Sequence, residues 1–172
     1  MCISLLFFSS IVLQGCSNNI EDVKKVLSSP DEDEDEVIEA CYWILNNQIT
    51  DTSVVKNVLT YIIDIRMSTS FEYYAQNPYQ LRIKVLEKIT GSKPPGEIKD
   101  LADASIIDHY LDWAIHRGLI KTKDDIYVIH PYLRQIHSSE MVIKGIINHD
   151  KVDWLKKYNW PQPPTRGKFH SK

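Results

Sequence analysis

Apolar residues recur every three or four positions over most of this chain, and this spacing restricts its fold more than any other feature. Such spacing places side chains on one face of an α-helix. The two most regular stretches have apolar residues at Val54, Val55, Val58, Leu59, Ile62 and Ile63, and at Ile106, Ile107, Tyr110, Leu111, Ala114 and Ile115. The sequence therefore predicts a mostly helical protein in which each helix buries one face.

Three further helices are predicted by the same pattern. A brief one over residues 20–27 ends at Ser28-Ser29-Pro30, and longer ones cover residues 37–49 and 81–89. We expect the helix over 37–49 to form an antiparallel hairpin with the stretch 54–63. The clearest break in the chain is the segment Gly91-Ser92-Lys93-Pro94-Pro95-Gly96.

The region after the helix over 106–115 predicts a change of structure. Gly118 is expected to end that helix as a C-cap, with Leu119 folding back. The segments Leu119–Thr122 and Ile126–His130 flank Lys123-Asp124-Asp125, which predicts a short β-hairpin. Apolar spacing in 131–158 predicts two or three more short helices.

The expected fold class is mostly α, with five to seven helices and one small β-hairpin near 119–130. The helices would form a compact bundle or a short stack of helix pairs, which would be 37–63, 81–115 and 131–158. No internal repeat is detectable by residue identity.

The first nineteen residues differ from the rest of the chain. The uncharged apolar run Ile3–Leu13 is about eleven residues long, whereas a helix needs roughly twenty to cross a membrane. The run leads into Leu13-Gln14-Gly15-Cys16, and polar residues follow. A short apolar run that ends at a small residue is typical of a cleaved signal peptide. The alternatives are a secretory signal without lipid and a buried N-terminal element of a cytosolic protein.

Leu13-Gln14-Gly15-Cys16 resembles the lipobox of bacterial prolipoproteins, a resemblance confined to residues 1–19. It implies cleavage between Gly15 and Cys16, a diacylglycerol on the Cys16 thiol and acylation of the new amino group. Two or three acyl chains give lasting membrane attachment where one gives only marginal binding. The resemblance implies a protein facing the periplasm or the cell exterior, and Ser17 favours the outer membrane in a Gram-negative cell.

The domain organisation follows from these patterns. Residues 1–15 are expected to be the signal peptide, 16–30 a lipidated tether with a short helix, 31–158 a single helical domain and 159–172 a Pro-rich basic tail. Cys41 would then have no disulfide partner in the mature chain. We interpret it as a small buried hydrophobe, and a reactive thiol is the alternative.

Charge is unevenly distributed although the net charge is only -3. Residues 17–41 contain nine acids and two lysines, whereas residues 151–172 contain six bases and one acid. The chain has no broad positive surface for phosphates, which argues against nucleic acid as a partner.

Two segments are candidates for binding another protein. The acidic run Asp31–Glu36 either complements the dipole of the following helix or attracts a basic surface. The tyrosines near residue 75 either contribute contact area or cover the core with their hydroxyls in water. The candidate partner-binding residues are Asp31, Glu32, Asp33, Glu34, Asp35, Glu36, Tyr73, Tyr74 and Tyr79.

Signals for catalysis are few. His109, Asp112 and His116 share a helix face that could offer metal ligands, but that face lies opposite the apolar stripe and is expected to meet solvent. We find no nucleophile elbow, phosphate-binding glycine loop or paired His/Cys spacing, so no catalytic residue, metal or cofactor is predicted.

The function favoured by these observations is a lipid-anchored, non-enzymatic module that binds another envelope or delivered protein. Its sharpest form is an immunity or inhibitor protein against a toxin or hydrolase delivered to the envelope. A structural or assembly lipoprotein of an envelope complex and an uncharacterised hydrolase are the alternatives, the latter because residues recruited from distant positions leave no sequence signal.

Overall fold

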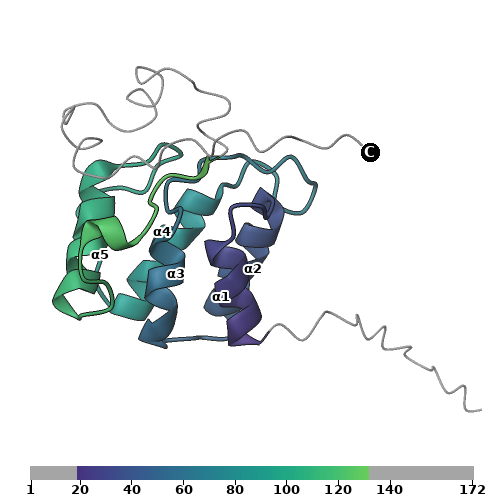
Figure 1. Ribbon diagram of the computed structural model, residues 1–172. Coiled ribbons are helices and arrows are strands. Elements are labelled where there is room, and N and C mark those ends of the chain that lie inside the picture. Colours follow the sequence, from purple (N-terminus) through teal and green to yellow (C-terminus); the bar gives the residue numbers. More distant parts are fainter. Residues whose placement is uncertain (1–18, 132–172) are drawn as a thin grey trace, which may run out of the picture.

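A computed structural model describes residues 19–131, and the signal segment, Cys16 and the basic tail lie outside this range. Residues 19–131 form five α-helices and two short 3-10 turns, and they contain no β-strand (Figure 1). The elements are α1 (Ile20–Ser28), α2 (Glu34–Asn46), η1 (Thr52–Val54), α3 (Val55–Leu59), α4 (Pro78–Thr90), α5 (Ala104–His116) and η2 (Lys123–Asp125). The mostly helical fold is therefore confirmed.

Helix starts are determined by polar capping side chains. Asn19 accepts backbone N–H groups at the start of α1, and Asp33, Asn77 and Asp103 do so for α2, α4 and α5. Asp51 caps the η1 turn that leads into α3. A capping oxygen satisfies a donor that would otherwise have no intrahelical partner, so these residues fix where each helix begins.

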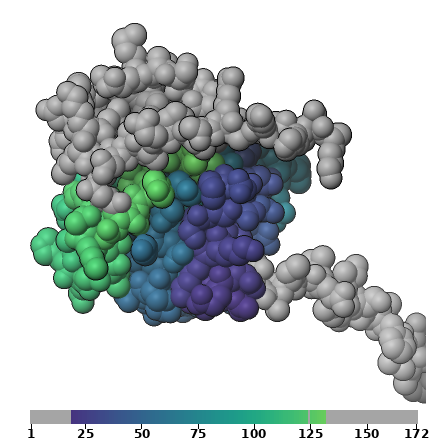
Figure 2. Space-filling model, in the orientation of Figure 1, coloured from purple at the N-terminus to yellow at the C-terminus, as the bar shows by residue number. Residues whose placement is uncertain are grey.

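The helices pack in an order that differs from their order in sequence. In Figure 1, α3 and α4 lie between α5 on one side and α1 and α2 on the other. Both α2 and α3 pack against α1 and α4, while α5 packs against α3. Figure 2 shows these segments meeting in one continuous surface. The expected antiparallel hairpin of neighbouring helices over 37–63 is therefore wrong, and α4 and α5 do not form the pair 81–115 either. Instead, α2 packs mainly on α4 and α1, and α5 packs on α3.

The helix expected over 54–63 ends early, at Leu59. Tyr61 adopts a left-handed backbone conformation with φ of 55°, which an α-helix cannot contain. The N–H of Ile63 donates to the carbonyl of Val128 at 2.8 Å, and the N–H of His130 donates to the carbonyl of Ile63 at 3.1 Å. Ile63 is fully buried in this extended segment, so its apolar character reflects the core and not a helix.

The β-hairpin expected over 119–130 is wrong. The Asp125 carboxylate accepts the backbone N–H groups of Lys121 at 2.6 Å and Thr122 at 3.1 Å, and this local capping builds the turn η2. The following segment, 126–130, forms an isolated parallel bridge with Ile63 instead of pairing with 119–122. The pairing partner is remote in sequence, so local turn signals could not identify it.

Other expectations are confirmed. The brief first helix is α1, and Gly118 ends α5 with φ of 71° while its N–H donates to the Ile115 carbonyl. Cys41 is fully buried, and burial raises the pKa of its thiol to about 12. In the part described, no helix has both the length and the apolar character needed to span a bilayer. The helices expected in 131–158 lie outside the described residues, apart from residue 131.

Candidate protein-interaction surface

The acidic run Asp31–Glu36 begins in the turn between α1 and α2 and ends in the first turn of α2. Asp33 caps α2 by accepting the Glu36 N–H at 2.9 Å, and the next three acids lie in the first helical turn. Negative charge there complements the partial positive charge at the helix start, as expected. Asp31, Asp33 and Glu36 are exposed, so the run also presents carboxylates to solvent.

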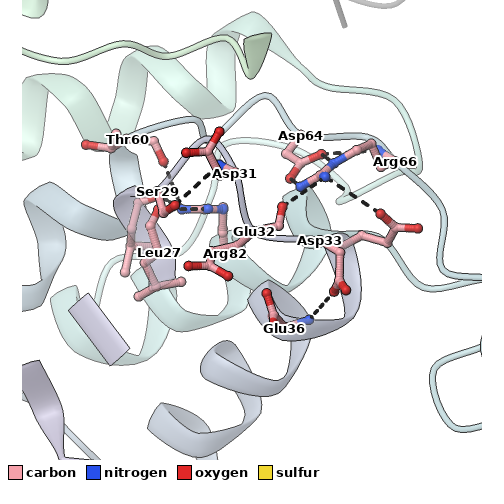
Figure 3. Close-up of polar contacts among 12 residues, drawn as sticks. Leu27, Ser29, Asp31, Glu32, Asp33, Glu36, Thr60, Asp64, Arg66 and Arg82 are labelled. Carbon is pink, nitrogen blue, oxygen red and sulfur yellow. Dashed lines mark hydrogen bonds and ion pairs between the residues drawn. The ribbon is translucent and has the colours of Figure 1, made fainter. Parts of the chain in front are cut away.

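Arg66 binds the acidic run to the segment that follows α3. Its Nη1 donates to the carbonyl of Glu32 at 3.1 Å and lies 3.7 Å from Oε2 of Glu34 (Figure 3). The other side of the guanidinium makes two 2.8 Å hydrogen bonds to the carboxylate of Asp64, which is fully buried. Burial alone would lower the pKa of Arg66, but the hydrogen bonds and charge of Asp64 outweigh it and raise that pKa. Arg66 is therefore a permanent cation under the acidic run.

Arg82 holds together, from inside the core, the end of the bundle at which α1 and α3 finish. This fully buried side chain of α4 donates from Nη2 to the Leu27 carbonyl at 2.9 Å, and from Nη1 to the carbonyls of Val58 at 3.0 Å and Thr60 at 2.9 Å. These carbonyls lie at the ends of α1 and α3, where no intrahelical donor is available. Burial lowers the pKa of Arg82. Arg82 therefore joins two helix ends and contributes no exposed charge.

The acidic run is electrostatically crowded at Glu36. A hydrogen bond with the Glu32 side chain raises the pKa of Glu36, and slight desolvation and the charges of Glu32 and Asp33 raise it further. Like charges held close together favour protonation of one of them. The run is therefore a concentrated negative site, and a basic surface bound to it would reduce the repulsion between its carboxylates.

A loop between α3 and α4, residues 67–76, is here named the aromatic loop. Its base is closed by Ser68, whose N–H donates to the Gln76 carbonyl at 2.8 Å and whose carbonyl accepts the Ala75 N–H at 3.2 Å. Phe71 is completely exposed, at 102% of its reference area, and Tyr74 is 74% exposed. The loop therefore holds two large aromatic side chains in water, where they are available for contact with another molecule.

The aromatic loop lies against α2, which also carries the acidic run. The Tyr73 ring stacks on Tyr42 of α2 with centroids 6.1 Å apart, and the Tyr42 hydroxyl donates to the Gln76 side chain at 2.6 Å. Burial and then the charges of Glu72 and Glu39 raise the pKa of Tyr73. The charge of Asp35, a member of the acidic run, also raises the pKa of Tyr73, so the base of the aromatic loop lies beside the part of α2 that carries the run.

Tyr79 does not belong to this surface. It lies in the first turn of α4, is fully buried, and its hydroxyl accepts the Asp103 N–H at 3.0 Å. Tyr73 is half-buried and Tyr74 is exposed, so the three tyrosines occupy three different environments. In the sequence, the one sign of this difference is that Tyr79 lies on the apolar face of a predicted helix, whereas Tyr73 and Tyr74 precede that helix.

The polar face of α5 has local partners. Nε2 of His109 is 2.8 Å from the Ser92 hydroxyl, Nδ1 of His116 is 2.6 Å from the Asp112 carbonyl, and Asp112 pairs with Lys123 at 3.0 Å. Across residues 19–131, no three His, Cys, Asp or Glu side chains converge in a way that could hold a metal ion.

No family model matches the chain, and no curated protein or solved structure is significantly similar to it. The functional argument therefore depends on this surface and on the sequence of the N-terminal segment.

Proposed function

We propose that this protein is a lipid-anchored module that binds another protein outside the cytoplasm through the acidic run and the aromatic loop. The anchor is Cys16, as the lipobox resemblance implies. The partner is a protein with a basic surface, and a toxin or hydrolase delivered to the envelope is the form we favour.

The observation that carries this proposal is the position of the surface relative to the N-terminal end. Asn19 caps the first residue of α1, whereas the acidic run follows its last residue. A helix of nine residues is about 13 Å long, so the two points lie at opposite ends of the bundle (Figure 1). A chain attached at Cys16 would then present its binding residues away from the bilayer.

The chemistry of the surface suits protein binding. Aromatic side chains bury a large area at a small loss of conformational entropy, and Phe71 and Tyr74 are already exposed for it. Surrounding carboxylates attract a basic partner and raise its association rate. Arg66 and the closed base of the loop hold both groups in place, which reduces the entropy lost on binding.

Two experiments test this proposal. Membrane fractionation of Cys16→Ser should move the protein from the membrane to the soluble fraction, and unchanged fractionation would reject the anchor. Affinity capture from envelope extracts should retain one defined protein on the wild type. That retention should be lost for Phe71→Ala/Tyr74→Ala and for a variant with amides at positions 31–36.

A matched control variant is Glu21→Gln/Asp22→Asn, which removes two exposed acids from the opposite end of α1. It should retain the partner as the wild type does. Equal retention by the control and both surface variants would reject the assigned surface, and no retained protein at all would reject the binding function.

A further inference from the structure

The described chain ends beside the candidate surface. The backbone of His130 pairs with Ile63, and its ring meets the edge of the Tyr61 ring at a centroid distance of 5.4 Å. Figure 1 shows this last segment reaching the end of the bundle where the loops after α1 and α3 lie. Residues beyond Pro131 therefore start from the same end as the acidic run.

Electrostatics support this placement. Burial lowers the pKa of His130 to about 4, and the charges acting on its ring come from Asp64, Arg66, Arg82 and Asp31. Asp31 begins the acidic run, and Arg66 donates to the backbone of Glu32. The point where the chain leaves the described body thus lies within the field of the acidic run.

The last 22 residues have the opposite chemistry. The segment 151–172 contains six bases and a single acid, Asp153, together with two tryptophans. The bases are Lys151, Lys156, Lys157, Arg166, Lys168 and Lys172, and the tryptophans are Trp154 and Trp160. The candidate surface offers the exposed carboxylates of Asp31, Asp33 and Glu36 and the exposed rings of Phe71 and Tyr74, so charge and apolar character match on both sides.

The intervening chain is long enough for this contact. Residues 132–150 are 19 residues, which would span about 24 Å as a flexible coil and about 28 Å as a helix. Because the charge of Asp31 acts on His130, near the point where the described chain ends, either length is enough to return residues 151–172 to the acidic run. A segment attached to the same molecule meets its binding surface at a much higher effective concentration than a separate molecule does.

We propose that residues 151–172 dock on the aromatic loop and the acidic run of the same molecule. The bases pair with carboxylates of Asp31–Glu36, and Trp154 or Trp160 packs against Phe71 and Tyr74. The contact is independent of the lipid anchor and of the existence of an external partner.

Zero-length carbodiimide cross-linking of the purified full chain tests this contact, because it joins lysine amines to carboxylates in direct ion pairs. An equal mixture of ¹⁵N-labelled and unlabelled chains separates links within one molecule from links between two. Counted per carboxylate, we expect lysines of 151–172 to link to the six acids of Asp31–Glu36 at least threefold more often than to Glu21 and Asp22, within one isotope. The excess should disappear in 1 M NaCl.

The variant Phe71→Ala/Tyr74→Ala keeps every carboxylate and should reduce the excess severalfold, while Leu101→Ala, which truncates an exposed leucine outside the loop, should not. Even linking to Glu21, Asp22 and the acidic run would overturn the proposal. Links that join labelled to unlabelled chains would overturn it in favour of a second copy as the occupant.

Discussion

Asp64 and Arg66 form a two-point ion pair in which the carboxylate has no exposed surface, although only one residue separates them in sequence. The pair joins the buried core to the exposed acidic run, because Arg66 also donates to the carbonyl of Glu32. Its first consequence concerns stability.

Replacing Arg66 with methionine should lower the free energy of unfolding by about 3–5 kcal/mol, because the buried charge of Asp64 loses its partner. Urea denaturation followed by circular dichroism measures this loss. The double variant Asp64→Asn/Arg66→Met should recover part of it, since no uncompensated charge remains. A loss below about 1 kcal/mol in the single variant would contradict the assigned role.

Replacing Arg82 with methionine should destabilise the fold by about 3 kcal/mol or more, because the carbonyls of Leu27, Val58 and Thr60 lose their donors inside the protein. Arg82→Lys should recover only part of the stability, since an ammonium group cannot reach both helix ends with the geometry of a guanidinium. Hydrogen exchange should show faster opening at the ends of α1 and α3 in both variants. Protection equal to the wild type there would contradict this explanation.

Stability should fall as the pH is lowered from about 7 to about 4, with a contribution from His130. Its pKa of about 4 in the folded protein lies below the value of about 6.5 in an unfolded chain, so the unfolded chain takes up the proton first. The stabilisation is complete above pH 6.5 and decreases by up to about 3 kcal/mol toward pH 4.

Thermal unfolding of the wild type and of His130→Asn across this pH range measures the contribution. The variant removes the titrating ring, so its stability should change less between pH 7 and pH 4 than that of the wild type. Parallel curves for the two proteins would show that His130 does not carry this pH dependence.

Glu36→Gln should stabilise the protein slightly at pH 7, by about 0.3 kcal/mol, because it removes repulsion from Glu32 and Asp33. Because folding raises the pKa of Glu36, protonation of Glu36 stabilises the folded protein. This stabilisation is complete below the pKa of the unfolded chain and is lost as the pH rises through the pKa of the folded protein. The gain should therefore shrink when the pH is lowered to 4. Glu39→Gln is the matched exposed control on α2, and an equal gain there would assign the effect to net charge alone.

The apolar spacing correctly predicted helices in the regions of α1, α2, α4 and α5. It failed at Ile62 and Ile63, whose spacing continues that of α3 although the helix ends at Leu59 and neither residue is helical. Spacing reports that a residue is buried, and two different backbone conformations can bury the same residue.

The candidate surface was only partly predictable. The acidic run can be recognised in the sequence because its six acids are consecutive. Tyr74, which the sequence also indicated, is exposed in the structure. Arg82 and Asp64 gave no signal, because a charged residue is expected at the surface and only tertiary structure reveals its buried partners. Tyr79 has the composition of a contact residue, but its position at the start of α4 directs it into the core.

The parallel pairing of Ile63 with the segment 126–130 also has a consequence for folding. The edge that buries Ile62 and Ile63 is completed by residues synthesised long after the first four helices. A nascent or truncated chain that stops before residue 126 would expose this apolar edge and be prone to aggregate. The early helices therefore depend on the end of the described chain for their final stability.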